Sequence, residues 1–167
     1  GSVERIKSRF RKIYPELEII VHAAASWEED PSSLLKTKED LARANMVLIT
    51  LVFLEDHISA ILPDLKKARE NCDLMLGLVS SKEIVNLTKM GGLDMSKPSS
   101  GVLKFLKKLR GDKNKVTGGE KQMAILRQIP KVLKFIPGKA QDLRAYFLSM
   151  QYWLAGSEEN IESLFCY

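Results

Sequence analysis

Residues 46–53 read Met-Val-Leu-Ile-Thr-Leu-Val-Phe and lie within the longest apolar run of the sequence. The run lacks the alternation of apolar and polar residues that a half-exposed strand shows, and this texture is typical of a strand buried on both faces of a parallel sheet. We therefore expect residues 46–53 to form an interior strand. The run is far shorter than the roughly 20 residues that a helix needs to cross a bilayer, so the sequence predicts no membrane span.

Two shorter apolar runs, Leu17–Ala24 and Leu74–Val79, predict two more strands on either side of this one. Segments with helical spacing of apolar residues separate the runs, and strands that alternate with helices imply right-handed parallel crossovers. The predicted helices are Val3–Tyr14, Ser32 or Ser33 to Ala44, Glu55–Asn71 with a bend at Pro63, and Ser81–Met90. For residues 1–96 we expect an α/β fold, a three-layer parallel sheet with helices on both faces.

Residues 97–167 are expected to be a helical C-terminal segment packed on that sheet, because no strand candidate follows Gly91. The predicted helices are Pro98–Leu109, Glu120–Phe135 and Gly138–Leu154. In the last of these, one face should carry Leu143, Phe147, Met150 and Leu154, which recur at spacings of three and four. A further helical pattern from Ser157 runs to the last residue, so we expect the chain to be a fragment of a larger protein.

Charge is distributed unevenly along the chain. The net charge is +5, but residues 97–144 hold 13 Lys and Arg against 3 Asp and Glu. Nucleic-acid binding would pair such charge with exposed stacking aromatics, whereas the aromatic residues here fall on apolar stripes, so no nucleic-acid partner is predicted. The alternatives are a solvated face and an interaction surface. The candidate interaction residues are Lys113, Lys115, Lys121, Lys139 and Arg144.

No catalytic motif is present in the sequence. The glycines and lysines near residue 115 do not form a phosphate-binding loop, and neither His22 nor His57 has a second ligand at metal-binding spacing. The two cysteines, Cys72 and Cys166, are too few for a disulfide framework and fit a reducing compartment. We therefore predict no catalytic residue, no metal site and no cofactor within this chain.

The carboxyl ends of the predicted strands deliver several polar residues to one edge of the sheet. Ligands of open parallel sheets bind at that edge. The candidates for contact with a ligand or a neighbouring domain are His22, Glu55, Asp56 and Ser80. The alternative is that Glu55 and Asp56 simply favour the start of the following helix, where the helix dipole stabilises negative charge by about 0.3–1 kcal/mol each.

Several stretches resemble the family of the large, porphyrin-binding H subunit of magnesium chelatase, which is related to the large subunit of aerobic cobaltochelatase. They are ANMVLITLVFLED at residues 44–56, EIVNLTKMG at 83–91, KVLKFIP at 131–137, KAQD at 139–142 and QYWLAGS at 151–157. The departures from the family pattern, Tyr152 for Phe and Ala155 for Gly, are conservative. The resemblance covers most of the chain but implies the N-terminal region of a much longer subunit.

The resemblance also implies a function for the complete protein. The family inserts Mg²⁺ into protoporphyrin IX with ATP hydrolysis, and two smaller ATPase-type subunits supply the energy. The implied partners are the remainder of the H subunit, both ATPase subunits and protoporphyrin IX. The implied location is the bacterial cytoplasm, or the plastid stroma for a plant or algal protein.

Within this family the chain itself is expected to have a structural or interaction role and to be inactive alone, since the catalytic residues lie downstream. Two alternatives remain open. One is a cobaltochelatase large-subunit domain, and the other is a stand-alone protein-interaction domain with a basic face.

Overall fold

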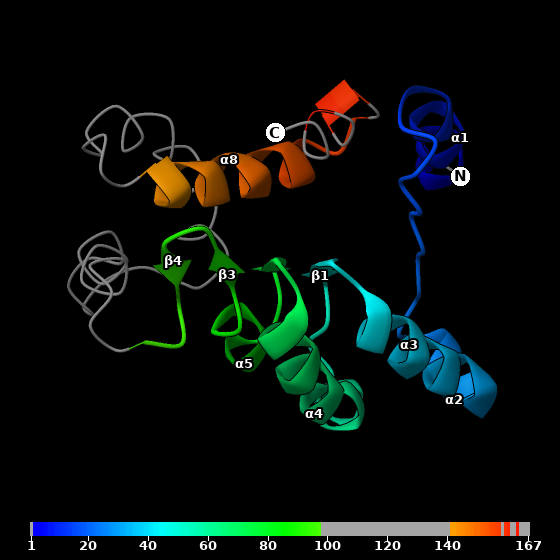
Figure 1. The fold of residues 1–167 in the computed structure, drawn as a ribbon. Coiled ribbons are helices and arrows are strands. Elements are labelled where there is room, and N and C mark those ends of the chain that lie inside the picture. Colours follow the sequence, from blue (N-terminus) through cyan, green and yellow to red (C-terminus); the bar gives the residue numbers. More distant parts are fainter. Residues whose placement is uncertain (1, 98–140, 158, 161–162, 164–167) are drawn as a thin grey trace.

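The structure is a computed structural model that describes residues 2–97, 141–157, 159–160 and 163. Its helices and strands follow one another along the chain as shown in Figure 1. In order they are α1 (Ser2–Ile13), α2 (Ser26–Glu29), α3 (Pro31–Arg43), β1 (Met46–Thr50), α4 (Glu55–Asn71), β2 (Leu74–Leu78), α5 (Lys82–Val85), β3 (Lys89–Met90), β4 (Leu93–Asp94) and α8 (Gln141–Ala155).

The sheet is mixed, with strand order β1-β2-β3-β4. Strands β1 and β2 are parallel, with Met46 opposite Leu74 and Thr50 opposite Leu78, and α4 forms the crossover between them. Strands β3 and β4 join by antiparallel pairing, β3 to β2 and β4 to β3. The α/β class predicted from the sequence is confirmed, but the expectation of an all-parallel sheet is wrong for half of the strands.

Two details of the predicted sheet need correction. Strand β1 lies at an edge of the described sheet and is not interior. A strand also follows Gly91, because Gly91 adopts a φ of +54° and lets residues 89–94 fold back as a tight hairpin. Strands of two residues are too short to leave a periodic signal in the sequence, and for this reason the pattern from Ser81 predicts a helix that continues to Met90.

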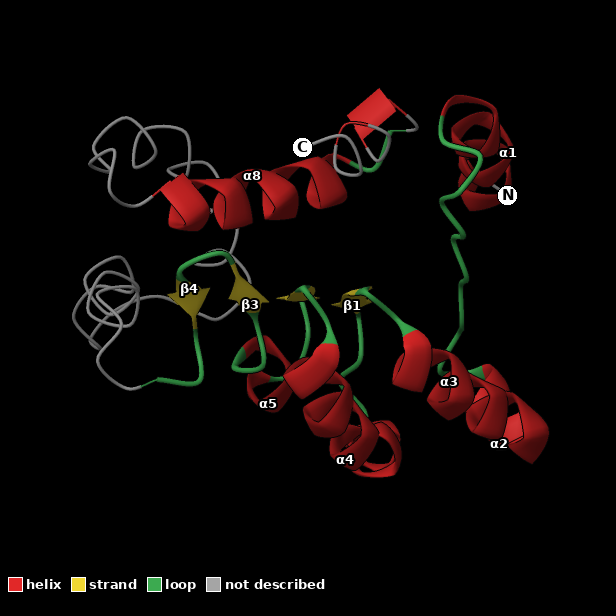
Figure 2. Ribbon diagram, in the orientation of Figure 1, coloured by secondary structure: helices red, strands yellow, loops and turns green. Residues whose placement is uncertain are grey.

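The segment Leu17–Ala24, which the sequence predicts to be a strand, is not one. Two side-chain contacts join the segment to α3. His22 Nε2 lies 2.9 Å from Asp40 Oδ2, and Glu18 Oε2 lies 3.4 Å from Arg43 Nη1. Figure 2 shows the segment as a loop that runs from α1 towards α2, away from the strands. Strand propensity depends on a neighbour to pair with, and the tie to α3 does not provide one.

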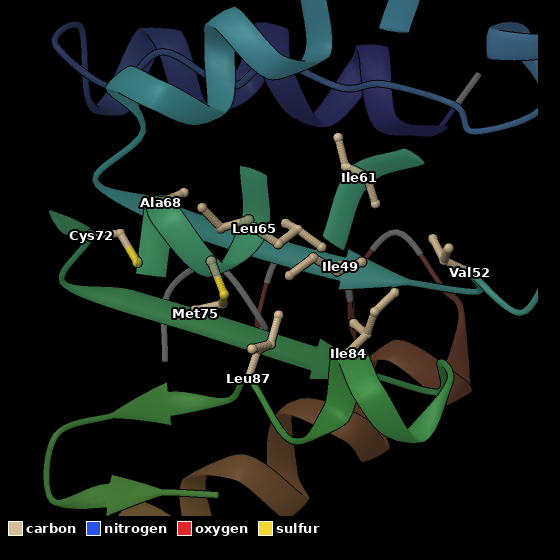
Figure 3. Close-up of a cluster of buried hydrophobic side chains, with 10 residues drawn as sticks. Ile49, Val52, Ile61, Leu65, Ala68, Cys72, Met75, Ile84 and Leu87 are labelled. Carbon is tan, nitrogen blue, oxygen red and sulfur yellow. The ribbon is translucent and has the colours of Figure 1, made fainter. Parts of the chain in front are cut away.

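Helices flank the described sheet on both faces, with α4 and α5 on one and α8 on the other (Figure 1). On the α4 face, Ile49, Met75 and Leu65 pack together with the buried Ile84 of α5 (Figure 3). The prediction of a helix over Glu55–Asn71 is confirmed, with Pro63 inside it. Each fully buried side chain of this kind stabilises the fold by about 1.5–3 kcal/mol.

On the other face, α8 is fixed by two polar contacts as well as by apolar packing. Tyr146 donates a hydrogen bond from its hydroxyl to the Gly77 carbonyl at 3.0 Å, and Asp142 accepts one from the Gly92 N–H at 2.8 Å. Burial raises the pKa of Tyr146 to about 12. The hydroxyl therefore stays a hydrogen-bond donor at neutral pH.

The face predicted for the last long helix is confirmed in part. Leu143 and Phe147 are buried, and Met150 packs against the same cluster. Leu154, predicted to share that packing, is 42% exposed. The predicted helices Pro98–Leu109 and Glu120–Phe135 lie outside the described residues, and the division into residues 1–96 and 97–167 stays a prediction.

Candidate functional site

The candidate site is the edge of the sheet where the parallel strands β1 and β2 both end. Each strand is followed by a residue with left-handed backbone, Leu51 with φ +59° and Val79 with φ +46°. Left-handed backbone is costly for branched and bulky side chains, by about 1–3 kcal/mol per residue, and persists only where surrounding contacts enforce it. Here the Leu51 N–H donates a hydrogen bond to the Val79 carbonyl at 3.0 Å. This bond links the two strained residues and helps to fix the backbone of both.

Ser80 and Ser81 extend this connection beyond the strands. The Val52 N–H donates to Ser80 Oγ at 3.2 Å, and the Ser81 N–H donates to the Val52 carbonyl at 3.0 Å. Ser81 Oγ also accepts from the Ile84 N–H at 3.5 Å and caps α5. The predicted site residue Ser80 therefore contributes its hydroxyl to the junction between the two strand ends.

Glu55 and Asp56 lie in the first turn of α4, and both are exposed. No side chain caps this helix, because the residue at the capping position is Leu54. Their position matches the alternative interpretation, in which two acidic residues favour a helix N-terminus. The same exposure leaves them accessible to a neighbouring surface.

His57, in the same turn of α4, is buried and joins α4 to α2. Its Nε2 lies 2.8 Å from Glu28 Oε1, and the Trp27 ring meets the imidazole edge-on at a centroid distance of 5.7 Å. Trp27 in turn donates from Nε1 to Thr37 Oγ1 at 3.1 Å. These contacts fix Glu28 beside the start of α4.

His22, the fourth predicted site residue, lies on the α3 side of the molecule. Its partner Asp40 also binds Arg43, whose hydrogen bond lowers the pKa of the Asp40 carboxyl. Among the contacts that the structure describes, none joins His22 to Glu55, Asp56 or Ser80. The structure thus brings Ser80 to the segment that leads into Glu55 and Asp56, and it places His22 in a separate network with α3.

An apolar patch lies at the same edge and is not predicted from the sequence. Leu51, Phe53 and Leu54 are 61%, 57% and 59% exposed, whereas Val52 between them is buried; we call these three residues the strand-end patch. Figure 3 shows Val52 just beyond the arrowhead of β1. No sequence signal marks this patch, because an apolar residue at the end of a buried run looks the same whether it is covered or not.

The hydroxyl of Thr50, the last residue of β1, is buried without a hydrogen-bond partner among the described atoms. A buried polar atom without a partner costs about 1–3 kcal/mol. The end of β1 thus combines three unfavourable features: strained backbone at Leu51 and at the neighbouring Val79, the Thr50 hydroxyl without a partner among the described atoms, and the exposed strand-end patch. Such concentrations of locally unfavourable features are typical of functional sites.

The predicted basic interaction residues are described only in part. Arg144 lies on α8 and is exposed, whereas Lys113, Lys115, Lys121 and Lys139 lie outside the described residues. Within the described part of the chain, no three His, Cys, Asp or Glu side chains are grouped so that they could hold a metal ion. None of the helices described is long and apolar enough to span a membrane.

The fold and this edge define an α/β domain whose distinctive feature is a rigid, partly apolar strand-end junction. A family described as "Domain of unknown function (DUF3479)" matches residues 1–147. The chain belongs to this family.

Relatives with established names show where such domains occur. The chain is 52% identical over 168 residues to the magnesium-chelatase H subunit of Cereibacter sphaeroides and equally to that of Rhodobacter capsulatus, in each case over 100% of the chain. It is 34% identical over 125 residues, 74% of the chain, to the chloroplastic magnesium-chelatase H subunit of Oryza sativa subsp. indica.

The chain spans 14% of the length of the two bacterial relatives and 9% of the rice relative. The resemblance to the N-terminal region of the magnesium-chelatase H subunit is confirmed.

Proposed function

We propose that the chain serves as the N-terminal domain of an H subunit that holds protoporphyrin IX while magnesium chelatase inserts Mg²⁺. In the complete enzyme, ATP would be hydrolysed by the two ATPase-type partner subunits, as an early step of bacteriochlorophyll or chlorophyll synthesis. The observation that carries this proposal is the 52% identity along the whole chain to the magnesium-chelatase H subunits of two bacteria. We propose a bacterial cytoplasmic enzyme, because the two relatives at 52% identity are both bacterial.

For the domain itself we propose a structural and interaction role, with chelation carried out elsewhere in the subunit. Three polar side chains, Ser80 at the candidate edge, His57 in α4 and His22 beside α3, support this role because they already serve the fold. Ser80 joins the two strand ends, His57 binds Glu28, and His22 binds Asp40. These side chains would have to give up structural contacts before they could bind a substrate.

The full-length subunit tests the proposed enzyme directly. Combined with its two ATPase subunits, ATP, Mg²⁺ and protoporphyrin IX, it should form magnesium protoporphyrin, which is followed by its fluorescence. Omission of either ATPase subunit should abolish the reaction. Activity with Co²⁺ and a corrin-type ring, and none with Mg²⁺ and protoporphyrin IX, would identify a cobaltochelatase instead.

The structural role of the domain has a separate test. Residues 1–167 are titrated with protoporphyrin IX, and the Soret absorbance is recorded. We expect no tight binding. Stoichiometric binding would contradict the proposal, because it would place a porphyrin site within this domain.

The basic residues that follow the sheet are proposed as contacts with the rest of the subunit or with the ATPase subunits. The test is the combined variant Lys113→Glu, Lys115→Glu and Lys121→Glu in the full-length subunit. Exposed charges contribute little to folding, so the melting temperature should change little. Assembly should weaken in a salt-dependent way, because steering between charged surfaces is screened beyond about 8–10 Å at physiological salt. Unchanged assembly and chelation rate at low salt would show that these lysines are merely solvated.

A further inference from the structure

The strand-end patch is held in place more firmly than an exposed loop requires. Leu51 and Val52 are each hydrogen-bonded to the end of the neighbouring strand, the first to the Val79 carbonyl and the second to Ser80 Oγ. Val52 is also anchored by its side chain, which is buried in the core beneath α4. The exposed side chains on either side of it are therefore presented by a fixed backbone. A preorganised surface loses little conformational entropy when it binds.

Leu51 is unfavourable in two ways within this chain. Its backbone is left-handed, a conformation suited to glycine or asparagine, and its apolar side chain is 61% exposed. A glycine or asparagine at this position would relieve the strain and expose less apolar surface. A residue type that lowers the stability of its own chain in this way indicates that a contact outside the chain requires it.

Acidic side chains lie on the α4 side of the patch. Glu55 and Asp56 follow Leu54 directly and are exposed, and Glu28, whose side chain is 67% exposed, is fixed beside them by His57. An apolar centre with a charged rim is the usual anatomy of a protein interface. The surface that complements it is apolar at its centre and basic on the side that faces α4.

We propose that the strand-end patch, Leu51, Phe53 and Leu54, is the docking surface for another domain of the same subunit. This inference rests on the proposed function, because it takes the rest of an H subunit as the occupant. The chain spans only 14% of the length of its bacterial relatives, so most of such a subunit lies outside it. Interfaces between domains of one chain typically bury roughly 600–1,500 Å², which requires an area around the patch as well as its three apolar side chains.

The test compares two exposed leucines in the full-length subunit. Leu54 lies in the patch and is 59% exposed, and Leu35 lies on α3 and is 60% exposed. The variants Leu54→Cys and Leu35→Cys are each treated with a maleimide, and labelling at each position is followed by mass spectrometry. If another domain covers the patch, the cysteine at 54 should react at least tenfold more slowly than the cysteine at 35. Equal rates would overturn the proposal.

A photoreactive amino acid, p-benzoylphenylalanine, incorporated in place of Leu54 then identifies the occupant. Cross-links to peptides beyond residue 167 of the same polypeptide are expected. Cross-links to a second copy, detected by mixing isotope-labelled and unlabelled subunits, or to an ATPase subunit would overturn the proposal. So would cross-links confined to residues 17–24, which would mean that this segment covers the patch.

The docking surface and the proposed function can fail separately. If the full-length protein does not chelate Mg²⁺ but position 54 is shielded and cross-links within the chain, the function is wrong and the docking surface stands. If it chelates Mg²⁺ and both cysteines react alike, the docking surface is wrong and the function stands.

Discussion

The sheet region, from β1 to β4 with α8, and the amino-terminal arm, residues 2–24, bury their apolar side chains to very different extents. In the sheet region, two clusters of buried residues fill both faces of the sheet. In the arm, Phe10 is the one fully buried residue of its cluster among those described, with Ile19 packed against it. Leu17 and Val21 of the arm stay 38% and 52% exposed.

The difference shows how much a strand depends on its neighbours. The runs at 17–21 and 46–50 are both apolar and rich in β-branched residues. Only the second forms a strand, because β2 provides a parallel partner for each of its residues. The first is fastened to α3 through His22 and Glu18, and its backbone takes no part in the sheet.

The largest expected effect compares two phenylalanines that are almost equally buried, Phe147 at 2% and Phe10 at 1% exposure. Phe147→Ala should lower the free energy of unfolding by about 3–5 kcal/mol, because it opens a cavity beneath α8. Phe10→Ala should lower it by less than half as much, because loss of the arm leaves both sheet clusters intact. Urea denaturation followed by tryptophan fluorescence measures both. Equal losses would mean that the arm and the sheet region unfold as one unit.

Gly77→Ala tests how closely the sheet region is packed. A Cβ at this position would lie 2.6 Å from the carbonyl oxygen of Ile84, and this backbone cannot move without shifting α5. We expect a loss of about 1–3 kcal/mol, the usual cost of overpacking. The control is Gly92→Ala, where the nearest atom is Asp142 Oδ2 at 3.3 Å. If the control lost as much stability as Gly77→Ala, close packing against α5 would not be the cause.

Thr37 and Thr50 allow a comparison between a hydroxyl that has hydrogen-bond partners and one that has none among the described atoms. Thr37, on the helix that anchors the arm, donates to the Ser33 carbonyl at 2.8 Å and accepts from Trp27, whereas Thr50 Oγ1 has no partner among the described atoms. Thr37→Val should therefore cost about 1–2 kcal/mol, and Thr50→Val should be neutral or stabilising by up to about 1 kcal/mol. Thermal unfolding of both variants gives the comparison. A clear loss from Thr50→Val would show that its hydroxyl has a partner in solution.

A further expected effect is a pH dependence that belongs to the sheet region. Hydrogen bonds from Ser96, together with the charge of Arg69, lower the pKa of Asp94 to about 2. The usual value is about 3.9, so the stabilisation is complete above about pH 4 and is lost as the pH falls towards about 2. Unfolding curves recorded across this acid range should show the decline, and Asp94→Asn should reduce it. An unchanged decline in the variant would assign the effect to other carboxyl groups.

Much of the fold is predictable because long elements leave periodic signals. The helices at 2–13, 31–43 and 55–71 and the two parallel strands follow from apolar spacing and from turn residues. The hairpin β3–β4 does not, since two-residue strands have no period and depend on Gly91 and on Asp142, which comes from a distant part of the chain. The strand prediction for residues 17–24 is wrong for the opposite reason. These residues have a strong local preference for a strand, but their contacts with α3 override it.

The candidate site is predictable only in its location. Strand ends of a parallel pair must meet at one edge, and the Val52 N–H accordingly donates to Ser80 Oγ, with Glu55 and Asp56 in the first turn of the helix that follows. A role for these residues in contact with a ligand or a neighbouring domain stays a prediction. The strained backbone at Leu51 and Val79 leaves no trace in the sequence, because neither residue type is one that normally adopts a positive φ. Family membership can be recognised from short motifs. These motifs share particular residues, whereas the spacing of apolar residues would be met by many other sequences.

The contacts of α8 also bear on how the chain acquires its structure during synthesis. Tyr146 reaches back to Gly77 across 69 residues, and Asp142 to Gly92 across 50. Contacts between positions so far apart slow folding, because the intervening chain must be ordered before they form. The ribosome releases β1 to β4 well before α8, so the face that carries Leu76 and Leu78 stays uncovered while the later residues are made. Nascent chains of this kind are expected to be substrates for chaperones that bind apolar surfaces until the covering helix arrives.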